Sequence, residues 1–281
     1  MYVGLKMRLS VILLLIFNFS CQKFENFPEV FTDGGRTLLL AHRGGVDGLH
    51  PENSFAAARK GLKVLDGIEL DIQVSADGTL WMAHDADLPD CELGKFNCFS
   101  QHTDQEIIDL SQCHGKDFAP GQLEDVLEIA TRNYPDAIIS LDIKPWFPCS
   151  LGDVFIHAKM KELADELALL ASRHQLGSQI FVESESITFL KYIKEVSSQI
   201  ECHILAFSDL EKAGLEALRN GLDGVSYKFD PDEEIDLEPL KAKGLTIQLW
   251  TVNTPENLQK ALAMKPHTIQ TDNLQLQEFM P

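Results

Sequence analysis

The sequence predicts one (β/α)8 TIM barrel of the α/β class, with an antiparallel β-hairpin after its second strand and a short insertion on its C-terminal face. Three observations support this fold. The chain has 281 residues, 44% of them hydrophobic, and about 250 residues is an ordinary size for one such barrel. Short apolar runs alternate with segments that begin at helix caps. Neither a linker-like stretch nor a repeat divides the chain.

Nine apolar runs have the length and composition of strands: Leu38–His42, Ile68–Val74, Leu80–His84, Ala137–Lys144, Ile180–Glu183, His203–Phe207, Asp223–Tyr227, Thr246–Val252 and Thr268–Thr271. Helix starts between them are indicated by the capping boxes Thr103-x-x-Glu106 and Ser208-x-x-Glu211 and by Thr254 before Pro255. Regular alternation of strands and helices predicts a parallel sheet.

A hairpin accounts for the ninth run, which an eight-stranded barrel does not need. Asp77-Gly78 lies between the second and third runs, and Asp-Gly between two strands is a hairpin signal. The third run is therefore expected to fold back antiparallel onto the second. A two-residue turn would place Asp71 opposite His84, with side chains about 5 Å apart and Glu69 on the same face. A slip of one residue would break this pairing.

The first 21 residues resemble an export leader. Lys6 and Arg8 are followed by the apolar stretch Leu9–Phe19, which is too short to span a bilayer but suits a signal peptide. Ser20-Cys21 then resembles a bacterial lipoprotein cleavage site, with Cys21 as the lipidated N-terminus. An ordinary secretory signal is the alternative.

These boundaries divide the chain into a leader (1–21), a tether (22–36) and a barrel domain (37–281). The protein is expected to be exported, as a periplasmic or outer-membrane lipoprotein of a bacterium. Contact with a membrane is expected only through a lipid on Cys21.

Five cysteines remain after Cys21, at positions 91, 98, 113, 149 and 202. Export permits a disulfide, for which Cys91–Cys98 is a candidate pair. Their spacing does not match a zinc site.

The chain carries a net charge of −19, and removal of Lys6 and Arg8 with the leader takes it to −21. Such a surface repels nucleic acid, so DNA and RNA are not expected as partners or substrates. A phosphate site would need local positive charge.

Polar residues collect where the predicted strands end, which is where barrel enzymes place their functional groups. The acidic pair Glu69-x-Asp71 lies on a strand expected to be buried, and an unpaired buried carboxylate is very costly. A hard divalent cation would balance the charge. Asp142 is the natural third carboxylate, and Glu52 is either a fourth ligand or a supporting group.

The residues themselves leave a structural alternative open, in which these carboxylates form salt bridges with Arg43 and Lys144. Glu183 is interpreted as a pocket or salt-bridge residue rather than a ligand.

Seven segments, in order, resemble motifs of the glycerophosphodiester phosphodiesterase family, which belongs to the PI-PLC-like phosphodiesterase barrels. They are Leu40-Ala41-His42-Arg43-Gly44, Pro51-Glu52-Asn53-Ser54, Ile68-Glu69-Leu70-Asp71, Ala83-His84-Asp85, Leu141-Asp142-Ile143-Lys144, Leu249-Trp250-Thr251-Val252-Asn253 and Thr271-Asp272. Each motif is weak by itself, whereas seven in sequence are specific.

This resemblance implies a barrel with a hairpin, a Ca2+ or Mg2+ ion, and hydrolysis of glycerophosphodiesters to glycerol 3-phosphate and an alcohol. It implies that His42 and His84 are the acid–base pair and that Glu69 and Asp71 bind the metal. Asp142 stands where the family usually has Glu, which leaves the affinity and identity of the metal open.

Residue chemistry suggests further roles. Arg43 and Lys144 would contact phosphate oxygens, and imidazole suits proton transfer near neutral pH. Asn53, Glu52 and Trp250 are expected to line the substrate or support the ligands. The nucleophile is either water or the glycerol 2-hydroxyl of the substrate.

Residues 86–121 lack clear strand character and follow His84 on the catalytic face, so they are expected to cover the site or to be a passive insertion. Three functions stay open. The leading one is a glycerophosphodiester phosphodiesterase. The others are a related phosphodiesterase of lysophospholipids or inositol phosphodiesters, and a non-catalytic binding lipoprotein.

Overall fold

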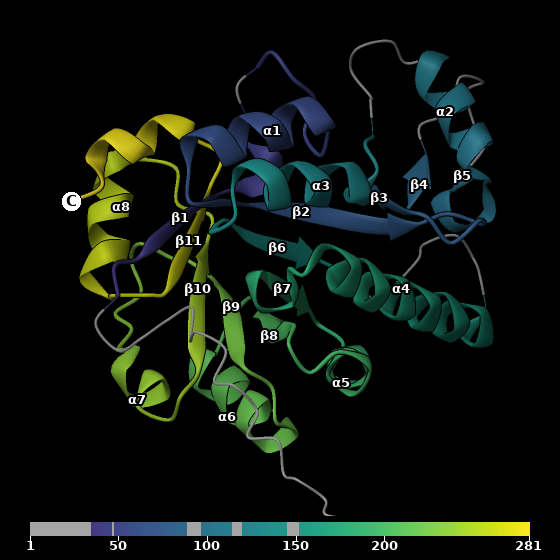
Figure 1. Cartoon of the computed structure of the whole chain (residues 1–281). Coiled ribbons are helices and arrows are strands. Elements are labelled where there is room, and N and C mark those ends of the chain that lie inside the picture. Colours follow the sequence, from purple (N-terminus) through teal and green to yellow (C-terminus); the bar gives the residue numbers. More distant parts are fainter. Residues whose placement is uncertain (1–34, 47, 89–96, 114–119, 145–151) are drawn as a thin grey trace, which may run out of the picture.

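A closed, parallel β-barrel surrounded by helices forms the body of the protein (Figure 1). The computed structural model describes residues 35–46, 48–88, 97–113, 120–144 and 152–281. Each barrel strand pairs with its neighbours in the sheet, and pairing of β1 with β2 closes the ring. This confirms the predicted (β/α)8 architecture.

The eight barrel strands are β1 (Leu38–Ala41), β2 (Gly67–Val74), β6 (Ile138–Asp142), β7 (Ile180–Ser184), β8 (Glu201–Ala206), β9 (Gly224–Lys228), β10 (Thr246–Trp250) and β11 (Thr268–Thr271). All of the predicted strands are present, and their ends differ by a few residues.

Helices cover the outside of the barrel, namely α1 (Phe55–Val64), α3 (Leu123–Asn133), α4 (Asp153–His174), α5 (Ile187–Val196), α6 (Leu210–Asn220), α7 (Glu238–Lys241) and α8 (Pro255–Ala263). Short 3-10 helices lie at η1 (His42–Gly44), η2 (Phe99–Gln101), η4 (Gly177–Gln179) and η5 (Leu274–Phe279).

Helix starts follow local capping chemistry. The side chain of Thr254 accepts a hydrogen bond from the Asn257 N–H and caps α8 as predicted. The expected cap at Ser208 is wrong, because Asp209 adopts a left-handed backbone and its carboxylate accepts from the Lys212 N–H instead.

The hairpin exists, but its register differs from the prediction. Strand β3 (Leu80–Met82) runs antiparallel to β2, and the Ala83 N–H donates to the Asp71 carbonyl at 2.9 Å, so Asp71 faces Ala83 and not His84. The loop has three residues rather than two, since the Ser75 N–H donates to the Thr79 carbonyl at 3.0 Å. Gly78, at φ 89°, supplies the left-handed residue that such a loop requires.

The insertion after β3 has its own structure beyond the end of β2 (Figure 1). It comprises the two-stranded sheet of β4 (Asp87–Leu88) and β5 (Asn97–Cys98), followed by η2 and α2 (Asp104–Cys113). Phe99 and Ile107 pack with Trp81 of β3 in a cluster separate from the main core. The insertion is therefore anchored on the outer face of the hairpin.

Hydrogen bonds reinforce this attachment. Asp104 accepts from the indole Nε1 of Trp81 at 2.9 Å, and its own N–H donates to Asp77 at 2.8 Å. The Thr103–Glu106 capping box is confirmed by reciprocal bonds of 2.8 and 3.4 Å.

The barrel interior changes from apolar to polar along its axis. Leu40, Ile138 and Phe181 form a small apolar cluster. Two residues further along two of these strands come Ser140 and Glu183, on the same face, since side chains alternate along a strand. Ser226, Gln248, Thr268 and Gln270 complete a buried polar layer. This layer leads from the apolar cluster to the ends of the strands.

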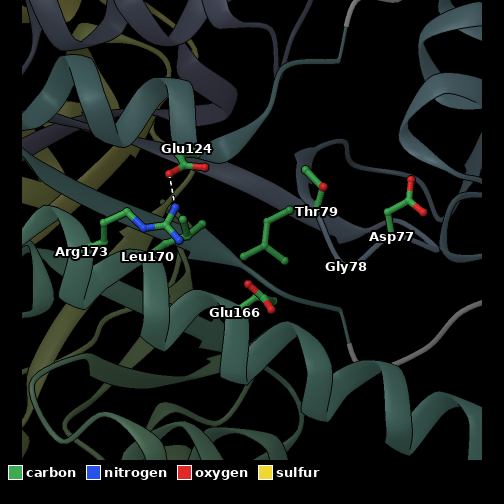
Figure 2. A pocket seen from close by; sticks show the side chains of 8 residues that line it. Asp77, Gly78, Thr79, Glu124, Glu166, Leu170 and Arg173 are labelled. Carbon is green, nitrogen blue, oxygen red and sulfur yellow. Dashed lines mark hydrogen bonds and ion pairs between the residues drawn. The ribbon is translucent and has the colours of Figure 1, made fainter.

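A pocket of about 200 Å3 lies outside the barrel, where the hairpin turn meets α3 and α4 (Figure 2). Asp77, Glu124 and Glu166 line it, and its Arg173 pairs with Glu124. Three carboxylates with one neutralised arginine disfavour a phosphodiester anion, so this pocket does not suit such a substrate.

Several predictions lie outside the described residues. They are the leader, the lipid on Cys21, most of the tether and one partner of the Cys91–Cys98 pair, although Cys98 itself is disulfide-bonded. Among the described residues, the helices are too short or too polar to cross a membrane. Mass spectrometry of the mature N-terminus would test the lipid.

Gly67 provides a test of barrel packing. A Cβ atom there would lie 2.1 Å from the Ile138 carbonyl oxygen of the neighbouring strand, whereas one on Gly152 meets nothing within 4 Å. Gly67→Ala should therefore lower the free energy of unfolding by at least about 2 kcal/mol, and Gly152→Ala by less than about 0.5 kcal/mol. Urea unfolding of both variants measures the difference, and equal stabilities would contradict the close strand approach.

Candidate active site

His42 follows β1, and it is oriented by Asp272, which follows the last barrel strand, β11. Its Nδ1 is 2.6 Å from Asp272 Oδ1, at the end of β11. A carboxylate can only accept, so Nδ1 carries the proton and Nε2 is left for proton exchange. The Asn253 side chain donates to Asp272 Oδ2 at 2.5 Å and accepts from the Asp272 N–H at 2.8 Å. Asp272 is therefore held on both sides.

The turn after His42 has an uncommon backbone. Arg43 has φ 53° and ψ 33°, in the left-handed region. This conformation aims its N–H at Glu69, and that N–H donates to Oε2 at 2.9 Å. Gly44 follows at φ 79°, and a Cβ atom there would lie 2.7 Å from the Ala58 nitrogen of α1. The site thus needs glycine at position 44.

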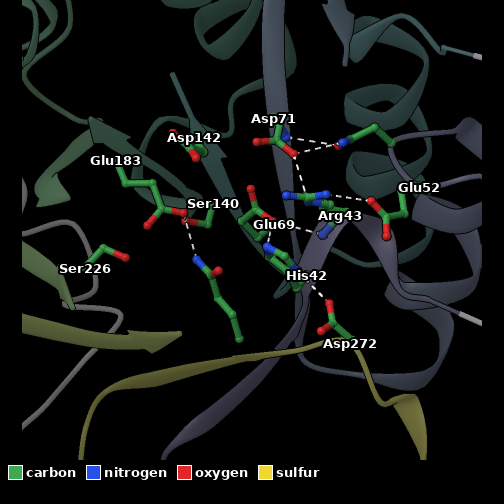
Figure 3. A network of polar contacts seen from close by, with 12 residues as sticks. His42, Arg43, Glu52, Glu69, Asp71, Ser140, Asp142, Glu183, Ser226 and Asp272 are labelled. Carbon is green, nitrogen blue, oxygen red and sulfur yellow. Dashed lines mark hydrogen bonds and ion pairs between the residues drawn. The ribbon is translucent and has the colours of Figure 1, made fainter. Parts of the chain in front are cut away.

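The Arg43 side chain joins two of the predicted residues (Figure 3). Its Nη1 donates to Glu52 at 2.7 Å, and its Nε lies 3.4 Å from Asp71 Oδ2. Asn53 also holds Asp71, by donating to Oδ2 at 2.8 Å and by accepting from the Asp71 N–H at 3.0 Å. Glu52 and Asn53 therefore position Arg43 and Asp71.

Three carboxylates meet where β6 ends, beside the part of β2 that pairs with it. Glu69, Asp71 and Asp142 each offer an oxygen within 4.8 Å of the others. Glu69 and Asp71 are buried. Lys144 Nζ donates to Asp71 at 2.6 Å and to Asp142 at 2.9 Å, so this lysine pairs with the cluster. The two interpretations from the sequence, a cation site and a salt-bridge network, therefore concern the same acidic groups.

The cluster fits a hard divalent cation. Asp142 Oδ1 is buried and has no hydrogen-bond partner within the described part of the chain, so one buried carboxylate oxygen lacks a donor there. Carboxylate oxygens are the ligands that Ca2+ and Mg2+ prefer.

Burial and mutual repulsion shift the proton affinities of these acids. Burial, followed by the charges of Asp71 and Glu183, raises the pKa of Glu69 well above its usual value. Burial also raises the pKa of Asp142 to about 7, against the opposing effect of Lys144. For Asp71, burial is outweighed by Lys144, Arg43 and His84, which together lower its pKa.

His84 follows β3 and is 40% exposed, with its Nδ1 2.7 Å from Asp85 Oδ1. Asp71 faces Ala83 and not His84, but this does not exclude His84 from the site. His84 lies after the end of β3, where side chains need not alternate between the two faces of the sheet. Its charge helps to lower the pKa of Asp71.

Trp250 ends β10, and its indole Nε1 is buried without a partner among the described residues. Its ring meets that of the half-exposed Phe207 edge-on, with centroids 5.3 Å apart. Phe207 follows β8, so the pair lies on the same end of the barrel as the acidic cluster.

Sequence reasoning placed Asp272 at a strand end but gave it no task. Its contact with His42 spans 230 residues and exists because closure puts β11 beside β1. The available signal was the position of Asp272 after the last strand, facing the first.

The raised pKa of Asp142 predicts how stability depends on pH. The folded state keeps a proton that the unfolded chain has lost between about pH 4 and pH 7. Stability should therefore fall as pH rises through this window, by on the order of 4 kcal/mol at most from Asp142. In chelator, urea unfolding of Asp142→Asn should show a shallower decline from pH 5 to pH 8.

Asp136→Asn, at an exposed position, is the matched control and should keep the wild-type slope. Equal slopes for wild type and Asp142→Asn would show that burial does not hold the proton on Asp142.

Comparison with known proteins agrees with this geometry. The sequence matches the Glycerophosphoryl diester phosphodiesterase family over residues 42–276. It is 24% identical over 243 residues to the glycerophosphodiester phosphodiesterase of Caldanaerobacter subterraneus subsp. tengcongensis, covering 85% of this chain and 95% of the relative.

Solved structures share the fold. A glycerophosphodiester phosphodiesterase from Parabacteroides distasonis aligns with a TM-score of 0.69 at 21% identity, covering 87% of this chain and 97% of the other. A phosphodiesterase from Oleispira antarctica, solved in complex with the product sn-glycerol-3-phosphate, aligns with a TM-score of 0.68 at 18% identity, covering 86% and 95%. The chain belongs to the glycerophosphoryl diester phosphodiesterase family and is a phosphodiesterase.

Proposed function

We propose that the protein hydrolyses glycerophosphodiesters to glycerol 3-phosphate and an alcohol, with His42 and His84 as the acid–base pair. The observation that carries this proposal is the pairing of both imidazoles. Each Nδ1 faces a carboxylate, Asp272 or Asp85, which directs Nε2 toward proton exchange. His42 Nε2 lies 3.8 Å from Glu69 of the acidic cluster, and the charge of His84 contributes to lowering the pKa of Asp71 in the same cluster.

Glu69, Asp71 and Asp142 would hold one divalent cation, Ca2+ or Mg2+, whose chemistry is to neutralise phosphate oxygens as a Lewis acid. The chain's own groups supply the rest. Arg43 is fixed by Glu52 beside the cluster, where its guanidinium can bind a phosphate oxygen. One imidazole takes the proton of the attacking oxygen, which belongs to water or to the glycerol 2-hydroxyl, and the other protonates the departing alkoxide. When the 2-hydroxyl attacks, a cyclic phosphate forms, and water then opens it to give glycerol 3-phosphate.

Trp250 and Phe207 form an aromatic wall at the strand ends of the barrel, on the same side as the acidic cluster. Such a wall can contact the alcohol group of a small diester. Lysophospholipid and inositol phosphodiesters belong in the same assay panel, because the wall also accepts apolar groups.

Histidine variants test the acid–base pair. His42→Ala and His84→Ala should each lower kcat by at least about 100-fold, the usual worth of one positioned acid or base. Release of glycerol 3-phosphate from glycerophosphocholine, with and without chelator, provides the measurement. His102→Ala, on the insertion, should keep full activity. Wild-type turnover in either of the first two variants would remove that residue from the mechanism.

Asp272→Asn tests the orientation of His42. An amide at this position can donate to Nδ1 and so favour the wrong tautomer. We expect kcat to fall about 100-fold or more while KM changes little.

Asp232→Asn, at an exposed position, controls for the loss of one acidic charge. A fall in kcat that comes with a matching loss of folded protein in Asp272→Asn would mean that Asp272 supports the fold and not the proton on His42.

A further inference from the structure

Glu183 is a buried carboxylate that the mechanism above does not use. It lies near the end of β7 and is 2% exposed. Gln270 donates to its Oε1 at 2.7 Å, Gln248 donates to its Oε2 at 2.8 Å, and the Ser140 hydroxyl is 3.4 Å from Oε1. These donors are uncharged. A carboxylate in such surroundings keeps a strong demand for positive charge, because neutral donors do not cancel it.

The surrounding amides are oriented toward this acid. The Thr268 hydroxyl donates to Gln248 Oε1 at 3.0 Å, which turns the Gln248 amide nitrogen toward Glu183. That nitrogen also lies 3.1 Å from the Ser226 hydroxyl and 3.2 Å from that of Ser140. The polar layer is therefore arranged as a set of donors around one acceptor.

Glu183 lies beside the acidic cluster, on the neighbouring strand β7 (Figure 3). In the pairing of β6 with β7 it is the register partner of Asp142, and Ser140, which it contacts, is the register partner of Glu69. Its charge helps to raise the pKa of both Glu69 and Asp142. Glu183 thus acts electrostatically on two of the three cluster acids, although its oxygens are held by the glutamines.

A role in packing alone does not explain a charged residue here. Glutamine has the same shape and would complete the layer without burying a charge or repelling the neighbouring acids. The carboxylate makes the metal-free barrel less stable, and this cost is recovered only when positive charge enters the cluster.

We propose that Glu183 is a positioning residue that raises the cation affinity of the Glu69–Asp71–Asp142 cluster. It does so through its negative charge on the neighbouring strand β7, without ligating the ion. This inference rests on the proposed function, because it assumes a cation at that cluster. The supporting group is a carboxylate held by neutral amides.

Calorimetric titration of the chelator-stripped full-length protein with Ca2+, and separately with Mg2+, tests the proposal. Glu183→Gln should bind at least one of these ions about tenfold more weakly than wild type, within the range usual for groups that support metal ligands. The stripped variant should also melt at the same temperature as wild type or higher, because a like charge has been removed. The Gln248 amide can turn over to accept from the new amide, since the Thr268 hydroxyl both donates and accepts.

Ser226→Ala is the matched control, because it removes a hydrogen bond from the same layer without removing charge. Its cation affinity should stay within about twofold of wild type, since the cluster keeps every carboxylate. Weaker binding by Glu183→Gln together with a lower melting temperature of the stripped protein would overturn the proposal, because a structural role predicts that combination.

Two further outcomes separate this inference from the proposed function. If wild type and Glu183→Gln bind the ion equally, the inference alone fails. If wild type binds neither ion, the cation assignment at Glu69, Asp71 and Asp142 fails, and the inference fails with it.

Discussion

Repulsion among buried carboxylates constrains the whole catalytic end of this barrel. Glu69, Asp71 and Asp142 each offer an oxygen within 4.8 Å of the others, and the charge of Glu183 on the neighbouring strand β7 adds to theirs. Burial and this repulsion both favour protonation, which explains why the pKa of Asp142 reaches about 7. The contacts that Arg43, Asn53 and Lys144 make with the cluster can be understood as responses to this charge. The cluster is tolerable because cations and N–H donors converge on it from several strand ends.

The backbone after β1 shows what that convergence costs. Arg43 and Asn53 both adopt the left-handed conformation, which costs a non-glycine residue on the order of 1 kcal/mol or more. In return, the Arg43 N–H reaches Glu69 and the Asn53 amide reaches Asp71. The Asn53 N–H also donates to the Arg43 carbonyl at 3.0 Å, so the two strained residues support each other. Strain at this turn and satisfaction of the acids are therefore one structural feature.

The barrel could be predicted from the sequence because it follows from periodicity, whereas the residues of the candidate site were predicted from strand ends and from the resemblance to a family. Alternation of strands and helices closes a barrel, and closure brings strand ends such as those of Glu69 and Asp142 to one edge. Register was not accessible in the same way. Asp-Gly occurs in two-residue and three-residue loops alike, and the choice at residues 76–78 depends on the Ser75–Thr79 backbone pair. The support of His42 by Asp272 depends on long-range closure, and local sequence does not encode it.

Because the protein is acidic and its substrate is an anion, positive charge is needed where the anion binds. The chain carries a net charge of −19, and the two cations nearest the cluster, Arg43 and Lys144, are both partnered by carboxylates. Lys144 contacts oxygens of Asp71 and Asp142, two of the three acids that fit a divalent cation. A cation bound there would therefore compete with Lys144 for the same acids, so that each weakens the contact of the other with them. The acids, Lys144 and Arg43 form one electrostatic unit, in which positive charge becomes available to a phosphate as the carboxylates are satisfied by another partner.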